Sequence, residues 1–148
     1  SFENFDWRIS IAEVREAGPF SRFENIDRTL MILKGRIVLT FEDRTMELDA
    51  DSAPFAFAGE LVCSGAPIGG PVTDLNVMTR RGLIMARVAL VANQTHQAAG
   101  EITLFVARKE TLVRRAGQES RLKPQDALLT DETCEMELTG EAFVIAIT

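Results

Sequence analysis

The stretch Thr29-Leu30-Met31-Ile32-Leu33-Lys34-Gly35-Arg36-Ile37-Val38-Leu39-Thr40-Phe41 decides the fold of this chain. Two runs of apolar and β-branched residues flank Lys34-Gly35, which is typical of two β-strands joined by a tight turn. The pattern returns half a chain length later, where Thr103-Leu104-Phe105-Val106 corresponds to Thr29–Ile32 and Leu112-Val113 corresponds to Val38-Leu39. The chain is therefore expected to contain the same strand pair twice.

Short strand-like segments also fill the rest of the chain. Trp7–Ile11, Leu75–Met78 and Met136–Leu138 alternate in polarity with the period of two that a half-buried strand shows. Turn-forming residues separate the segments, at Gly18-Pro19, Asp49–Pro54, Gly65–Pro71, Gly100, Gly117 and Gly140. The longest candidate helix, Ala12–Ala17, is too short and too poorly capped to form. The sequence therefore predicts an all-β fold.

The repeat continues without a gap when the sequence is compared with itself at an offset of half its length. Leu48 then falls on Leu122, and Ala53 falls on Ala127. Several short strands at regular spacing favour a sandwich or barrel, and two halves packed sheet on sheet would protect each other's edge strands. We expect a bicupin: two cupin-like double-stranded β-helices, residues 1–74 and 75–148, together forming one compact domain.

Composition and charge exclude several classes of protein. The 148 residues are 46% hydrophobic, enough for one core. The net charge of −6 argues against nucleic acid or an anionic membrane as a partner, and no apolar run is long enough to span a bilayer. Two isolated cysteines, Cys63 and Cys134, suit a reducing cytoplasm. The sequence leaves a homodimer open.

The chain lacks the residues that usually hold a cupin metal. Such enzymes use two or three imidazoles and a carboxylate, whereas His96 is the only histidine here and lies in Asn93–Gly100, which resembles an exposed loop. Cys63 and Cys134 are not spaced as a zinc pair. No nucleotide fingerprint or nucleophile elbow is present, and tyrosine is absent. We therefore expect no metal and no cofactor, and chemistry limited to carboxylates and arginines.

The two halves differ in their polar residues. At the same offset, the positions that correspond to Arg8 and Ser10 are Gly82 and Ile84, so a site is expected only in the first half and in the strand that leaves it. Arg8 and Ser10 share one face of a strand. That face either meets solvent or lines the barrel, where Arg8 would need an anionic partner such as Asp27, Asp74 or a ligand.

A second polar face follows the predicted strand Thr73–Arg80. Its residues suit the wall of a pocket, although they could instead satisfy nearby backbone in a connector; they are Asp74, Asn76, Met78 and Arg80. Among the aromatic residues, Phe20, Phe55 and Phe57 are expected in the core. Phe23 is a candidate for ligand contact because it follows the Gly18-Pro19 turn.

Five ordered motifs resemble the HutD/Ves family, most strongly over residues 5–82. They are Trp7-Arg8-Ile9-Ser10-Ile11-Ala12, Gly18-Pro19-Phe20-Ser21-Arg22-Phe23, Asp27-Arg28-Thr29-Leu30 with Leu33-Lys34-Gly35, Pro54-Phe55-Ala56-Phe57-Ala58-Gly59 and Gly70–Arg81. The family pattern usually has a Trp-x-Asn-Gly-Gly-Gly-x-Thr segment before the Trp-Arg pair, and the sequence begins after that point. The candidate site residues are therefore expected to be a partial set.

The resemblance implies a bacterial bicupin that accompanies histidine-utilisation enzymes and has no established catalytic activity. Such a protein would bind a pathway acid, such as urocanate or a formylated or formiminated glutamate, and moderate the pathway. An acid of this kind would suit Arg8, Arg28 or Arg80 as a carboxylate fork, with Ser10, Asp74 and Asn76 setting its orientation. The alternative is a metal-independent hydrolase or isomerase acting on such an acid, with Asp74 as general base.

Overall fold

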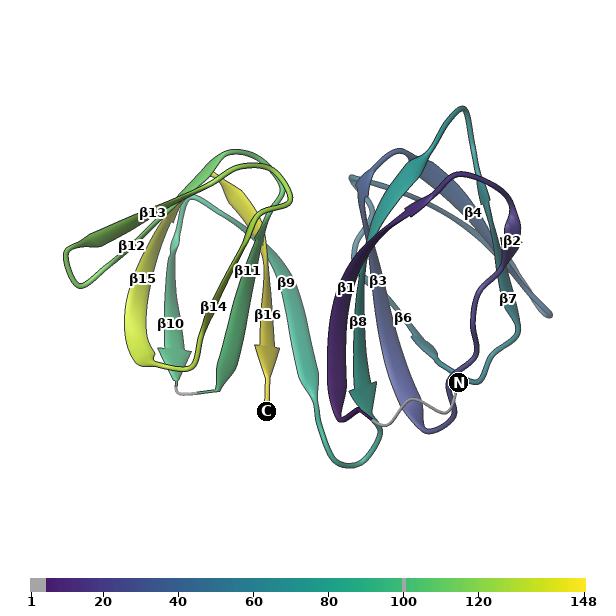
Figure 1. The fold of residues 1–148 in the computed structure, drawn as a ribbon, viewed down its shortest axis with the longest axis horizontal. Helices are drawn as coiled ribbons and strands as arrows, with labels where there is room; N and C mark the ends of the chain where they lie inside the picture. Colours follow the sequence, from purple (N-terminus) through teal and green to yellow (C-terminus); the bar gives the residue numbers. More distant parts are fainter. Residues whose placement is uncertain (1–4, 100) are drawn as a thin grey trace. The chain divides into compact units, whose positions relative to one another are not determined.

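The computed structural model describes residues 5–99 and 101–148, which form strands joined by turns (Figure 1). This confirms the predicted all-β class. The first strands are β1 (Trp7–Val14), β2 (Gly18–Pro19), β3 (Ile26–Lys34), β4 (Arg36–Phe41), β5 (Thr45–Asp49), β6 (Phe55–Ala58), β7 (Cys63–Pro67) and β8 (Val72–Arg80). The remaining strands are β9 (Ala86–Ala92), β10 (Thr95–Ala99), β11 (Ile102–Ala107), β12 (Thr111–Arg115), β13 (Gln118–Leu122), β14 (Ala127–Thr130), β15 (Thr133–Thr139) and β16 (Glu141–Ile147). The described residues contain no helix long and apolar enough to cross a membrane.

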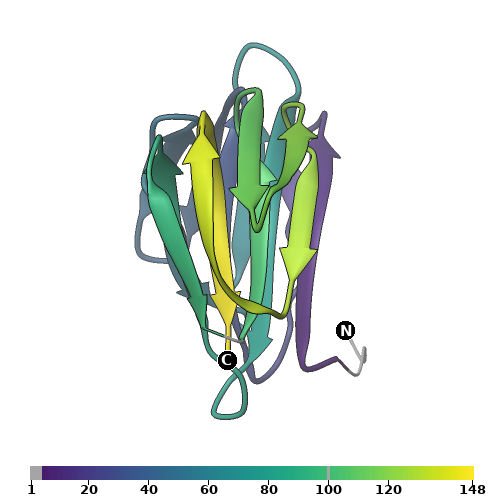
Figure 2. The same ribbon diagram turned by 90° about the vertical axis from the view of Figure 1, so that its left-hand side faces the viewer.

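The strands form two units with the same topology. In the first unit, the sheet β1-β8-β3-β6 faces the sheet β2-β7-β4-β5; in the second, β9-β16-β11-β14 faces β10-β15-β12-β13 (Figures 1 and 2). All pairings are antiparallel, and the two orders match strand for strand, so the duplicated cupin architecture is confirmed. The units divide between Met85 and Ala86. This boundary differs from the expected division at residue 74, because β8 pairs along its length with β1 and β3.

A fixed offset of half the chain length aligns equivalent residues of the two units in part of the repeat. It does not align the residues of β3 with their equivalents in β11. Ile32 and Leu39 are seven residues apart in the core of the first unit, whereas Ala107 and Val113 are six apart in the core of the second. The cause is a β-bulge between Ile32 and Lys34, which adds one residue to the first half. A shift of one residue exchanges the faces of a strand. The inward-facing counterpart of Leu30 is therefore Phe105 rather than Leu104.

Apolar side chains fill the interior of the first unit between its two sheets. Residues of β3 and β4 meet there, among them the fully buried Leu30, Ile37 and Leu39. Polar groups interrupt this core on β3 and β8: Arg28 and Asp74 are only 5% and 3% exposed. Buried charges require partners or a functional reason. The candidate site is built around these residues.

Candidate functional site

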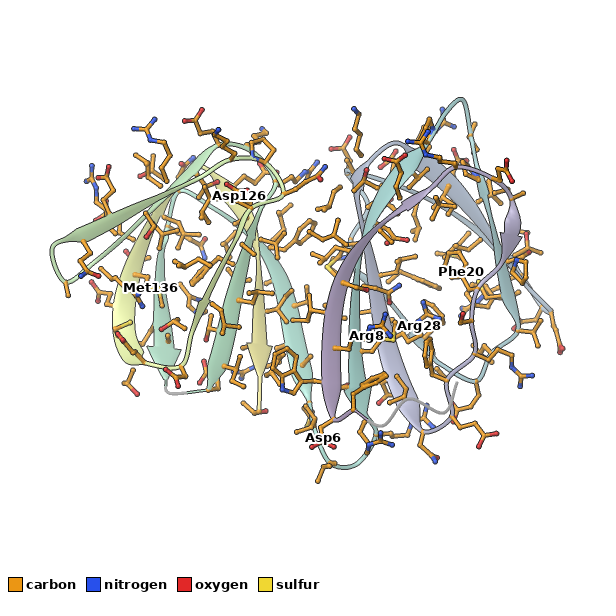
Figure 3. All side chains as sticks on the ribbon, in the orientation of Figure 1. Asp6, Arg8, Phe20, Arg28, Asp126 and Met136 are labelled. Atoms are coloured by element: carbon orange, nitrogen blue, oxygen red, sulfur yellow. The ribbon has the colours of Figure 1, made fainter. Side chains whose placement is uncertain are left out.

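A cavity of about 280 Å³ opens into the first unit beside the edge strands β1 and β2. Side chains from β1, β3 and β8 and from the segment that begins with β2 form its walls. The lining residues are Arg8, Ala12, Val14, Pro19, Phe20, Ser21, Phe23, Arg28, Asp74, Asn76 and Met78. Figure 3 shows Arg8 and Arg28 pointing into the interior from the β1-β8-β3 side, with Phe20 on the other side. The cavity therefore combines two guanidinium groups with a buried carboxyl group.

Arg28 is held at the centre of this cavity by oxygen atoms and aromatic rings. Its Nη1 donates to the carbonyl oxygen of Ser21 at 3.0 Å, and its Nε donates to Oδ1 of Asn76 at 3.4 Å. Its guanidinium carbon lies 5.6, 5.5 and 5.0 Å from the ring centres of Phe20, Phe23 and Phe57. These distances are within the range of cation–π attraction. Burial lowers the pKa of Arg28, although arginine remains charged in proteins.

Asp74 supplies the buried carboxyl group. It lies on β8, opposite Ala12 of β1 and Ile32 of β3. Its Oδ1 has no hydrogen-bond partner among the residues that the structure describes. Burial raises the pKa of Asp74 to about 6, opposed by the positive charge of Arg28 and by a hydrogen bond from the Ala12 backbone. The cavity therefore contains one acceptor oxygen without a protein donor.

The structure brings together most of the site residues expected from the sequence. Those lining the cavity are Arg8, Phe23, Arg28, Asp74, Asn76 and Met78. Ser10 lies opposite Asn76 in the β1–β8 pairing but outside the set of lining residues. That these residues bind a ligand remains a prediction.

Arg80 does not line the cavity, contrary to expectation. Its Nη2 donates to the carbonyl oxygen of Phe5 at 2.6 Å, and its Nε lies 3.7 Å from Oδ1 of Asp6. The alternation along β8 places Arg80 on the same face as Asp74, but it lies at the end of the strand, where the segment before β1 pairs with it. Arg80 therefore holds the segment that precedes β1 against the end of β8.

Arg81 has a structural role that the sequence reasoning missed. Its Nε bonds Oδ1 of Asp27 at 2.8 Å, and its two terminal nitrogens bond the Glu60 carboxylate at 2.8 and 2.9 Å. Glu60 also accepts the backbone N–H of Asn25 at 3.0 Å, and these bonds lower its pKa to about 2. The second arginine of the Arg80-Arg81 pair thus ties the end of β8 to the start of β3.

Phe20 and Phe57 were expected in the core, yet both also contact Arg28. A glycine makes room for Phe20: a Cβ on Gly65 would lie 2.7 Å from the Phe20 ring and 2.9 Å from Ile37. Gly18 pairs with Gly65, and the N–H of Phe20 bonds the Cys63 carbonyl oxygen at 2.9 Å. The Gly18-Pro19-Phe20 motif together with Gly65 is the sequence feature from which the position of Phe20 in the cavity wall could have been predicted.

His96 lies in strand β10 and not in an exposed loop, so that prediction was wrong. It pairs with Met136, and its ring meets Phe105 edge-on, with 5.6 Å between ring centres. The polar composition of Asn93–Gly100 concealed the strand, because β10 is an edge strand with one face exposed. Within residues 5–99 and 101–148, no group of three histidine, cysteine or acidic side chains is placed to hold a metal ion.

Comparison with known proteins agrees with this fold. Residues 1–146 match the HutD family model. The chain belongs to the HutD family. An uncharacterised 21.2 kDa protein from the hutC 3' region of Pseudomonas putida is 30% identical, with 98% of this chain and 80% of that protein covered. The protein Ves of Citrobacter koseri is 34% identical over 66% of this chain and 51% of its own length.

Solved structures extend the HutD comparison. HutD from Pseudomonas fluorescens SBW25 matches with a TM-score of 0.87 and 29% identity, covering 99% of this chain and 80% of that one. A cupin 2 conserved barrel domain protein from Leptotrichia buccalis matches with a TM-score of 0.63 and 9% identity, covering 98% and 84%. The second likeness shows the cupin fold alone. The P. putida relative is named for its location in the hutC 3' region.

Proposed function

We propose that this HutD-family protein binds a small carboxylate intermediate of histidine degradation, of the urocanate or formyl- or formimino-glutamate type, and thereby moderates histidine utilisation. The observation that carries the proposal is the buried guanidinium of Arg28, which is only 5% exposed and lines an open cavity. A buried cation that faces a cavity is a natural partner for an organic anion.

The donors of Arg28 fit this role. Its Nε and Nη1 bond Asn76 and Ser21, while no described residue accepts a hydrogen bond from its Nη2. The rings of Phe20, Phe23 and Phe57 exclude water from the guanidinium, which strengthens its attraction for a carboxylate. The exposed Arg8 lines the same cavity and can attract the anion at the entrance.

Asp74 favours a ligand that also has a hydrogen-bond donor. Its Oδ1 lacks a donor among the described residues, so a ligand N–H, such as that of an imidazole or a formimino group, would satisfy it. The cavity volume of about 280 Å³ lies just below the ~300–1,000 Å³ range of small-molecule sites. A compact acid with an N–H group therefore matches both the charge and the size of the cavity.

Calorimetry and thermal-shift measurements on the full-length protein would test the proposal. The acids are urocanate, formiminoglutamate, formylglutamate, glutamate and formate, and we expect at least one histidine-pathway acid to bind more tightly than glutamate or formate. Arg28→Lys keeps the charge but loses the planar fork, so binding should weaken by about ten-fold or more. Arg36→Lys, on the exposed face of β4, is the matched control. The proposal fails if no acid stabilises the protein.

The second candidate is a metal-independent hydrolase or isomerase acting on the same class of acid. The raised pKa of Asp74, about 6, favours it, because a general base works best when its pKa lies near the working pH. Proton NMR of each acid incubated with the protein would detect turnover. Turnover that is lost in Asp74→Asn while binding persists would establish the enzyme. Binding without turnover would exclude the enzyme and support the binding protein.

A further inference from the structure

A second cavity, of about 200 Å³, lies in the second unit, where the comparison of the two halves at a fixed offset gave no reason to expect a site. It is lined by strands β9, β10 and β16, the counterparts of β1, β2 and β8. Its walls are mostly aliphatic, and two polar side chains join them. The lining residues are Arg87, Val88, Ala89, Val91, His96, Val144 and Ala146.

Strand pairing shows that the two cavities occupy equivalent positions. In the first unit, Arg8 lies opposite Met78, which also pairs with Arg28. In the second, Arg87 lies opposite Ala146, which also pairs with Thr103. Arg87 is therefore the counterpart of Arg8, although a fixed half-length offset does not align the two. A cation is kept at the entrance of both cavities.

His96 takes the place of Phe20. The backbone N–H of Phe20 bonds the carbonyl oxygen of Cys63 on β7. His96 pairs with Met136 on β15, the counterpart of β7, and Met136 has the position on β15 that Cys63 has on β7. Both rings therefore enter from the second strand of their unit and cover its interior. The difference is chemical, because His96 brings a nitrogen atom: its Nε2 is buried and has no hydrogen-bond partner among the described residues.

The two cavities differ in their deeper walls. At the positions of Asp74 and Asn76, the second unit has Ala142 and Val144, of which Val144 lines its cavity. An unpaired buried nitrogen in apolar surroundings costs free energy that a ligand can recover. The second cavity thus offers one hydrogen-bonding nitrogen, one cation at the entrance and aliphatic walls.

We propose that the second unit binds a small monocarboxylate with a short apolar body. One carboxylate oxygen accepts a hydrogen bond from Nε2 of His96, the Arg87 guanidinium neutralises the negative charge, and Val91, Val144 and Ala146 enclose the aliphatic part. This ligand differs from that of the first unit because, among the described residues, no carboxyl or amide side chain lines the second cavity to receive a ligand N–H.

The single histidine of the chain makes the test direct, because every imidazole NMR signal belongs to His96. Butyrate is the probe, added at matched pH and ionic strength against sodium chloride. We expect saturable shifts of the His96 ring nitrogens with a dissociation constant on the order of millimolar, as for a ligand of so few atoms. Butanol, which has the apolar body without the charge, should bind more weakly.

Three substitutions at exposed positions of β9 locate the binding. Ala89→Phe fills the cavity and should abolish the butyrate response, whereas Ala92→Phe, on the other face of the strand, should retain it. Arg87→Gln should weaken binding by about ten-fold. The proposal is overturned if butyrate leaves the His96 signals unchanged, if Ala89→Phe binds as well as the parent protein, or if butanol and butyrate bind equally. None of these results depends on whether the first unit binds its acid.

Discussion

Replacing Asp74 by Asn should change how the stability of the first unit depends on pH. The pKa of Asp74 is raised from 3.8 to about 6, chiefly by burial. Between these values the folded protein therefore holds a proton that the unfolded chain has released. The free energy of unfolding falls as pH rises through this window. The gap between 3.8 and about 6 corresponds to about 3 kcal/mol.

Asp74→Asn keeps the shape of the protonated side chain and removes its titration. The free energy of unfolding of the variant, minus that of the parent protein, should therefore increase by about 2 kcal/mol between about pH 4 and about pH 7.5, most of the full span. Urea unfolding at a series of pH values would measure this difference. Trp7, the only tryptophan, is a suitable fluorescent probe because it lies in β1, which pairs with β8.

Asp43→Asn is the matched control, since Asp43 is an exposed carboxylate between β4 and β5. Its stability difference from the parent protein should vary little over the same range of pH. The reasoning about Asp74 is refuted if the Asp74→Asn difference is constant with pH or decreases as pH rises. A ¹³C NMR titration of the Asp74 carboxyl carbon would give the pKa itself.

Three further substitutions have expected outcomes. Arg28→Met should raise the pKa of Asp74 further, because the charge of Arg28 opposes the effect of burial, and a ¹³C titration that shows no increase would contradict this. Gly65→Ala should cost about 1–3 kcal/mol of stability and weaken acid binding by displacing Phe20, whereas Gly18→Ala, with open space around its Cβ, should do neither in urea unfolding and calorimetry. Leu30→Ala should cost about 2–5 kcal/mol in urea unfolding, since Leu30 is fully buried; a loss below about 1 kcal/mol would argue against the core assignment.

The sequence was sufficient to predict the all-β class and the duplication. Alternating polarity and turn residues mark strands locally, and the repeat is strongest where both halves keep the same spacing, as at Leu39 and Val113 or Leu48 and Leu122. The β-bulge after Ile32 could not be predicted, because an extra residue in a strand leaves the composition unchanged. Arg87, the counterpart of Arg8, was missed for another reason: the chain from Arg8 to Arg28 is about four residues longer than the chain from Arg87 to Thr103, so no single offset aligns both pairs.

Most residues of the first cavity could be predicted because strand alternation places Asp74, Asn76 and Met78 on one face. The same rule failed for Arg80, since alternation gives the face of a residue but not the segment that covers the end of the strand. It also could not show that Phe20, which packs against the apolar core, would contact Arg28 as well. That contact depends on the space at Gly65, which lies on a different strand.

The β-bulge between Ile32 and Lys34 has a consequence for how the two halves can diverge. Deleting Leu33 would bring Lys34 into regular pairing opposite Thr73 and leave Arg28, Leu30 and Ile32 opposite Met78, Asn76 and Asp74. A loss of one codon there would therefore keep the cationic centre in place and reproduce the six-residue spacing that separates Ala107 from Val113 in the second unit. Reading-frame-preserving deletions in this family should therefore be better tolerated at this one position than within the strand that carries Arg28, where a lost residue exchanges the faces of the strand. Recombination between the halves would likewise keep the faces of the strand, because Arg28, Leu30 and Ile32 correspond to the buried Thr103, Phe105 and Ala107.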